Sequence, residues 1–145
     1  MGADDLARAH PLARVLAWLS SHPAVTAALG GPGRVGLYNE PPYPRLRVVD
    51  TNAGTDRDLR WLIAPEIQIE AYGDLDGTPG KAALNFILYT ALGALKELPE
   101  QAAAPGEPVI THVMSSRGGG PVPEPTGQQR YVAAVLVYAH PGTPV

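Results

Sequence analysis

Hydrophobic positions near the start of this 145-residue chain recur at helical spacing. The repeat runs through Leu12, Val15, Leu16 and Leu19. It predicts an amphipathic helix over Leu6–Ser20, with Asp4 or Asp5 as a cap and Pro11 in a first turn. A second, short helix is predicted over Pro23–Leu29, because the Gly-Gly-Pro-Gly run at 30–33 is a strong stop.

Alternation with a period of two then predicts three strands. Short strands are expected at Arg34–Tyr38 and Arg45–Asp50, separated by a Pro-rich turn, and the longest at Trp61–Tyr72. The polar segment Thr51–Arg60 is predicted to be a loop. The longest strand carries isoleucines on one face and glutamates on the other, which is typical of an antiparallel strand buried on one side.

Pairing of these strands would bring opposite charges together. If Arg45–Asp50 forms a hairpin with Trp61–Tyr72, its arginines face the glutamates of the longer strand. Such cross-strand pairs contribute about 0.2–1 kcal/mol each.

A strongly apolar helix is predicted over Pro79–Leu98, with Thr78 as its N-cap. Its polar stripe is narrow, and a helix this apolar is usually buried on more than one side. One side has to meet the sheet, and a neighbouring subunit is a candidate cover for the other. The candidate interface residues are Ile87, Leu88, Leu92 and Leu95.

Two further strands are predicted near the C-terminus, at Val109–Ser115 and Tyr131–Ala139, with a long Gly- and Pro-rich loop between them at Ser116–Gln129. The order α-α-β-β-β-α-β-β predicts one α+β domain over residues 1–145. Its sheet would be mostly antiparallel or mixed, with about five strands, packed by the N-terminal helix and the long central helix.

Composition narrows the possible functions. The chain contains no cysteine, which excludes disulfides, thiolate metal sites and a cysteine nucleophile. Its net charge of −3 gives no general attraction to nucleic acids or membranes. No segment approaches the roughly 18 apolar residues of a membrane span.

Candidate chemical motifs fail their context tests. Residues 31–36 match G-x-G-x-x-G, but a helix precedes them and a strand follows, the reverse of a dinucleotide site. Asp74 and Asp76 lack the later ligands of a calcium loop, and the four histidines have no metal-site spacing. The Gly-rich run at 118–120 has no helix after it to form an anion cradle. We therefore predict no catalytic, cofactor or metal site, and a structural or interaction protein in place of an enzyme.

Several segments in order carry a family resemblance. They are residues 11–16 (PLARVL), 22–25 (HPAV), 33–35 (GRV), 41–44 (PPYP), 65–73 (PEIQIEAYG) and 130–132 (RYV). With these segments, the chain resembles the tail terminator, or tail completion, proteins of long non-contractile-tailed bacteriophages (siphoviruses). The match spans nearly the whole chain and is one of pattern and element order.

The resemblance implies a hexameric ring in the virion, at the head-proximal end of the tail, made in the host bacterial cytoplasm. Such a ring caps the tail tube, ends its polymerisation and joins the tail to the head. Its implied partners are other copies of the chain, the major tail tube protein and the head–tail connector or neck protein. The lumen leaves room for DNA without sequence-specific recognition. By topology, the tube or lumen loops would carry Arg57, Asp58, Arg60 and Arg117.

Other functions stay open from the sequence. One is a neck or head-completion protein, and another is a small non-viral binding module. An enzyme with an unrecognised site would need a pocket that gathers His112 with Glu66 or Glu70.

Overall fold

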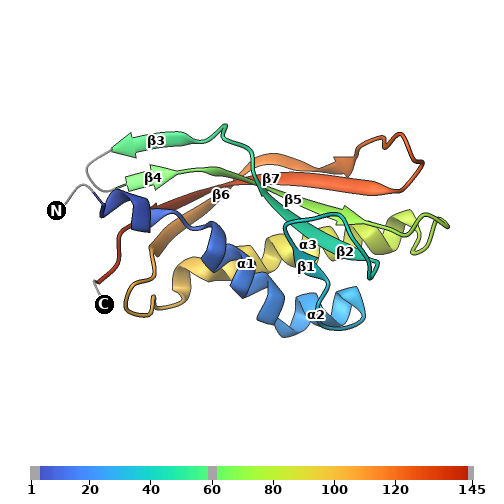
Figure 1. The fold of residues 1–145 in the computed structure, drawn as a ribbon, viewed down its shortest axis with the longest axis horizontal. Coiled ribbons are helices and arrows are strands. Elements are labelled where there is room, and N and C mark those ends of the chain that lie inside the picture. The colour runs from blue at the N-terminus through green and yellow to red at the C-terminus, as the bar shows by residue number, and fades with distance from the viewer. Residues whose placement is uncertain (1–3, 59–61, 144–145) are drawn as a thin grey trace.

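Three α-helices lie against one face of a mixed sheet and leave its other face uncovered by helices (Figure 1). The computed structural model describes residues 4–58 and 62–143. This arrangement confirms the predicted α+β class, with the N-terminal helices and the long central helix packed on the sheet.

The N-terminal helical region is broken in two. A 3-10 turn, η1 (Leu6–Ala9), precedes α1 (Leu12–Ser21), so the prediction of one helix over Leu6–Ser20 was wrong. His10 is extended, with φ −64° and ψ 124°, because the residue before a proline is pushed out of the helical region. The predicted cap is also wrong, since both Asp4 and Asp5 bind Arg8 instead.

The second helix, α2 (Pro23–Leu29), has the predicted bounds and ends at Gly30 with φ 86°. The long helix, α3 (Lys81–Glu97), begins two residues later than predicted, after Gly80, and continues as the 3-10 turn η2 (Leu98–Glu100). Thr78 is not its cap, because the Asp76 carboxylate accepts hydrogen bonds from the backbone N–H and hydroxyl of Thr78 and holds it in the preceding turn.

Within the described residues, the sheet contains seven strand segments. They are β1 (Val35–Gly36), β2 (Arg45–Asp50), β3 (Thr55–Asp58), β4 (Leu62–Ala64), β5 (Glu66–Tyr72), β6 (Val109–Pro121) and β7 (Arg130–His140). β7 pairs with β5 and β4 along one side and with β6 along the other. β2 pairs with β5, and the short β1 lies parallel to β2 at the edge.

The number of strand segments is larger than the five predicted, partly because one long hairpin is interrupted. The segment Thr51–Arg60, predicted as a loop, contains β3, and the predicted strand Trp61–Tyr72 is split into β4 and β5 at Pro65. Pro65 lacks the N–H that a ladder requires. Opposite it, the backbone of Gly54 approaches so closely that a Cβ would lie 2.4 Å from the Ala64 carbonyl oxygen.

The last two strands are longer than predicted. β6 extends to Pro121, so much of the loop predicted at Ser116–Gln129 is strand, and only residues 122–129 connect β6 to β7. Register shifts between β6 and β7 accommodate the Gly-rich run. Gly119 also allows a close approach to α3, because a Cβ there would lie 2.8 Å from the Tyr89 ring.

The core lies between the sheet and the helices. α3 packs against β5, β6 and β7 on one side and against α1 and α2 on the other. The chain's own helices therefore cover part of the apolar surface that the sequence analysis assigned to a neighbouring subunit. The largest fully buried hydrophobic side chains are Leu19, Leu29, Leu46, Ile67, Ile69, Leu84, Leu88, Leu95, Leu98 and Ile110.

Candidate functional site

The segment between β1 and β2, residues 37–44, places apolar side chains in solvent. Leu37 is 40% exposed and Tyr38 is 66% exposed, and Pro41 and Pro42 beside them are also exposed. Exposed apolar residues that cluster in this way often mark a surface that binds another protein. Hydrogen bonds from the neighbouring strand β2 to this segment hold it in a fixed shape.

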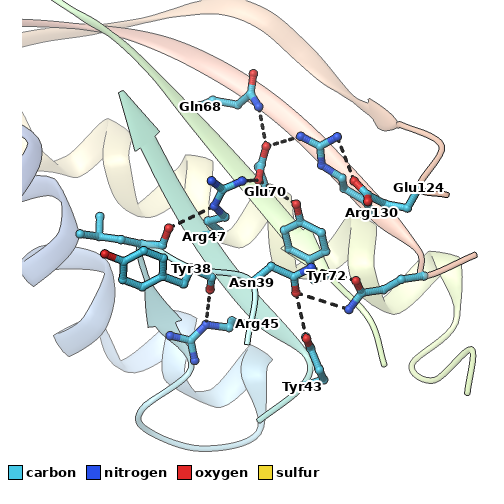
Figure 2. Close-up of polar contacts among 12 residues, drawn as sticks. Tyr38, Asn39, Tyr43, Arg45, Arg47, Gln68, Glu70, Tyr72, Glu124 and Arg130 are labelled. Atoms are coloured by element: carbon cyan, nitrogen blue, oxygen red, sulfur yellow. Dashed lines mark hydrogen bonds and ion pairs between the residues drawn. The ribbon is translucent and has the colours of Figure 1, made fainter. Parts of the chain in front are cut away.

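Two arginines of β2 hold this segment by its backbone (Figure 2). Arg45 Nε donates to the Tyr38 carbonyl oxygen at 2.8 Å, and Arg47 Nε donates to the Leu37 carbonyl oxygen at 3.1 Å. Arg45 is only 6% exposed, and it fits because Gly36 has no side chain, since a Cβ at Gly36 would lie 2.4 Å from the guanidinium. These bonds use two carbonyls of the predicted strand Arg34–Tyr38, and the strand itself is limited to Val35–Gly36.

Glu70 of β5 lies at the centre of the polar contacts beneath the segment (Figure 2). Its carboxylate accepts hydrogen bonds from Arg47 at 3.0 Å, from the Tyr72 hydroxyl at 3.0 Å and from Gln68 at 2.5 Å, and it is also bound by Arg130 of β7. The sequence prediction that β2 arginines face β5 glutamates is confirmed for Arg47 and Glu70. The glutamate is nevertheless 1% exposed, on a strand face that was expected to be polar and wet.

The electrostatic balance at Glu70 favours the charged form. Burial alone would raise the pKa of this carboxyl group, but hydrogen bonds from Arg130 and Gln68 and the charge of Arg130 outweigh it, so the pKa lies below its ordinary value. Burial and the neighbouring Glu70 charge raise the pKa of the Tyr72 hydroxyl. Tyr72 therefore acts as a neutral donor, and the cluster is a structural support.

The connection between β6 and β7 is tied to the same segment. Asn39 donates to Gln128 Oε1 at 2.9 Å, and the Gln128 amide donates to the Gly73 carbonyl oxygen at 2.7 Å. Glu124 forms an ion pair with Arg130 at 3.2 Å. Hydrogen bonds thus link three segments that are far apart in the sequence, and they fix the position of residues 37–44.

The predicted subunit-interface residues lie mostly inside the chain. Ile87, Leu88 and Leu95 are at most 2% exposed and belong to the core, while Leu92 is partly buried against it. The large side chains that α3 exposes are instead Phe86, at 65%, and Tyr89, at 49%.

The predicted tube or lumen residues are only partly visible. Arg117 lies on β6 and donates to Gln68 Oε1 at 3.3 Å, so it belongs to the uncovered face of the sheet. Arg57 and Asp58 lie in β3, and their side chains fall outside the described residues, as does the whole of Arg60.

The enzyme alternative finds no support in the described residues. His112 packs its ring against Tyr138, with centroids 5.8 Å apart, while Glu66 binds Ser116 and Thr51. Hydrogen bonds from these two hydroxyl groups lower the pKa of Glu66. Glu70 is enclosed by arginines.

Within residues 4–58 and 62–143, no three His, Asp or Glu side chains gather in a way that could hold a metal ion. None of the helices described is long and apolar enough to cross a membrane.

The sequence predicted part of the structure around residues 37–44. The Pro41-Pro42-Tyr43-Pro44 run correctly indicated a turn, but nothing in the spacing showed that Arg45 and Arg47 would bind the turn's backbone. Opposite charges on the two paired strands correctly predicted the Arg47–Glu70 pair. The third partner, Arg130, comes from a strand 60 residues away, which no local pattern indicates.

The fold also has a known counterpart. No family model and no curated protein matches the chain. Among solved structures, a chain in the virion of a native gene transfer agent particle aligns over 93% of this chain and 97% of that chain, with a TM-score of 0.66 and 14% sequence identity. At this identity the likeness shows a shared fold.

Proposed function

We propose that this chain is a structural virion protein of a phage-like particle, and that it forms a ring at the head-proximal end of a long tail. The ring caps the tail tube, ends its polymerisation and provides the surface that joins tail to head. Its partners are further copies of itself in a hexamer, the major tail tube protein and the neck connector. It needs no cofactor and performs no catalysis.

The observation that carries this proposal is the shared fold. The alignment covers nearly all of both chains, so the likeness extends beyond a common supersecondary motif. The matched protein is part of a virion, and the sequence resemblance to tail terminators independently suggests the same class of particle. A fold alone does not determine a function, so the site has to agree with it.

The candidate site supports a role in protein contact. A buried Arg–Glu cluster, with its members on β2, β5 and β7, holds an apolar segment in solvent and has no group arranged for proton transfer or nucleophilic attack. Preorganisation of this kind favours binding, because less conformational freedom is lost when a partner docks.

The experiment is removal of the gene from a particle-producing strain, followed by electron microscopy of the particles. We expect tails of abnormal length, or tails that fail to join heads, and complementation by the intact gene restores normal particles. Deletion of a neighbouring tail gene in parallel is the control. It shows which defects follow from the loss of any tail protein.

The outcomes separate the proposal from its nearest competitor. Tubes of normal, uniform length beside unjoined, filled heads would indicate a neck or head-completion protein, since tube polymerisation would then have ended without this chain. Infectious or transfer-competent particles at normal yield without the gene would contradict any essential virion role.

A further inference from the structure

We infer that successive copies of this chain join through two different apolar patches, one on the β1–β2 segment and one on α3. The loop patch is defined as Leu37, Tyr38, Pro41 and Pro42, and the helix patch as Ala82, Phe86 and Tyr89. The loop patch of one copy docks on the helix patch of the next. This inference rests on the proposed ring and assigns its contact surfaces.

The two patches lie at opposite edges of the sheet. The loop patch follows β1, which is the edge strand beyond β2 and β5. The helix patch lies beside the other edge, because the Tyr89 hydroxyl accepts a hydrogen bond from the Gly119 N–H of β6 at 3.2 Å. Different patches on opposite sides of one chain give head-to-tail contacts, the arrangement that closes into a ring.

Both patches are exposed and held in fixed positions. The loop patch is anchored by Arg45, Arg47 and Asn39, as described above. The helix patch lies on one stripe of a 17-residue helix whose opposite sides are buried in the core. Rigid aromatic side chains in such positions are typical of residues that dominate binding energy.

The apolar area fits the centre of an interface. An aromatic side chain has about 150–250 Å² of surface, so the exposed parts of the two patches together offer on the order of 400 Å². A stable interface buries roughly 1,600 Å² in total, with an apolar centre and a polar rim. The patches therefore supply the centre and leave the rim to their polar neighbours.

Charges at the rim complement each other. Glu40 lies beside the loop patch and is 55% exposed despite its ion pair with Arg45. Lys96 is exposed on the same stripe as Tyr89, two turns further along α3, and makes no ion pair with any residue that the structure describes. The opposite signs favour a second copy of the chain as the partner and orient it.

The first test uses Tyr38→Asp and Phe86→Asp, with assembly measured by light scattering over a concentration series. Each variant should weaken self-association by at least about tenfold, because a charge replaces an interface anchor. Leu75→Asp is the matched control: Leu75 is 67% exposed and outside both patches, so this variant should assemble as the wild type does. Circular dichroism and thermal melting confirm that all three fold.

Mixing the two defective variants gives a sharper result. Each retains one intact patch, and the two intact patches are complementary, so an equimolar mixture should form 1:1 heterodimers and nothing larger. Patches that bound their own kind would instead let each variant form a homodimer through its intact patch and give no heterodimer, which would overturn the inference.

Crosslinking gives a second readout, because the chain has no native cysteine. Glu40→Cys combined with Lys96→Cys, treated with a short bismaleimide, should give a ladder of covalent multimers that ends at the ring size. Each single variant should give no more than a dimer.

These outcomes distinguish failure of the inference from failure of the proposed function. Wild-type chain that assembles while Tyr38→Asp and Phe86→Asp assemble equally well would overturn the patches and leave the ring intact. Wild-type chain that stays monomeric at every concentration, with no ladder, would contradict the ring itself.

Discussion

Glu70 accepts hydrogen bonds from side chains on three strands, and its own strand contributes two of the donors. A buried carboxylate is costly unless its charge is compensated, and here two guanidinium groups compensate it. One of these, on Arg47, also binds the Leu37 carbonyl, so the charge that holds the sheet together also shapes the exposed segment. Fold stability and the shape of the loop patch therefore both depend on Arg47.

Replacing this carboxylate should destabilise the fold. Glu70→Gln removes both ion pairs, so Arg47 loses its carboxylate partner and Arg130 keeps only Glu124. We expect the free energy of unfolding to fall by about 2–3 kcal/mol, below the full cost of breaking a buried pair because the arginines are partly exposed. Urea denaturation measures this change. Glu97→Gln, at a surface carboxylate paired with His22, is the control and should change stability by less than about 1 kcal/mol.

The contribution of the Glu70 carboxylate to stability should depend on pH. The folded-state pKa of Glu70 lies below its ordinary value of 4.5, so its charged form stabilises the folded state above that value. This contribution disappears as the pH falls through the lower, folded-state pKa. Wild type should therefore lose more unfolding free energy than Glu70→Gln between pH 7 and about pH 3. Parallel stability curves for the two proteins would show that Glu70 does not contribute in this window.

At the scale of elements, the sequence predicted the features that local patterns encode. It did not predict the features that depend on tertiary contacts. The glycine stop after α2 helped to give its correct bounds, because a helix end at glycine is encoded locally. β3 was missed because a polar edge strand has no apolar alternation to reveal it. The α3 interface was placed on side chains that lie mostly in the chain's own core, since periodicity does not say which neighbour covers a helix.

The interrupted hairpin should depend on Gly54. An alanine Cβ there would lie 2.4–2.5 Å from backbone atoms of Ala64, Pro65 and Glu66, so the backbone has to move. We expect Gly54→Ala to lower the free energy of unfolding by roughly 1–3 kcal/mol, as overpacking does. Gly118→Ala, where a Cβ would meet nothing within 4 Å, is the matched control and should stay within about 0.5 kcal/mol of wild type. Equal effects in both variants would show that the close approach is unimportant.

At the scale of the whole molecule, the centre of the sheet is extensively paired, whereas the β3–β4 end has few pairs with the rest of the sheet. β5 and β7 pair over seven consecutive positions, and the core packs against both. β3 pairs only with β4 along its described length, and β4 meets β7 at a single pair, Ile63 and Ala139. The loop patch lies close to the firm centre through Arg47 and Glu70, whereas β3 lies beyond the interruption at Pro65. Contacts that require a fixed surface are therefore expected at the loop patch, and adaptable ones near β3.

This difference should appear in native-state hydrogen exchange. Amides of β5 and β7 should exchange only through global unfolding, with protection equal to the full free energy of unfolding, because their hydrogen bonds lie inside the ladder. Amides of β3 should exchange through local opening and be much less protected. Glu70→Gln should lower protection in β2 and β5 and leave the small protection of β3 unchanged, since β3 pairs with β4 and lies beyond the interruption at Pro65. Protection in β3 equal to that in β7 would instead mean that the hairpin opens as one unit with the sheet, and that the distinction between a firm centre and an adaptable edge is wrong.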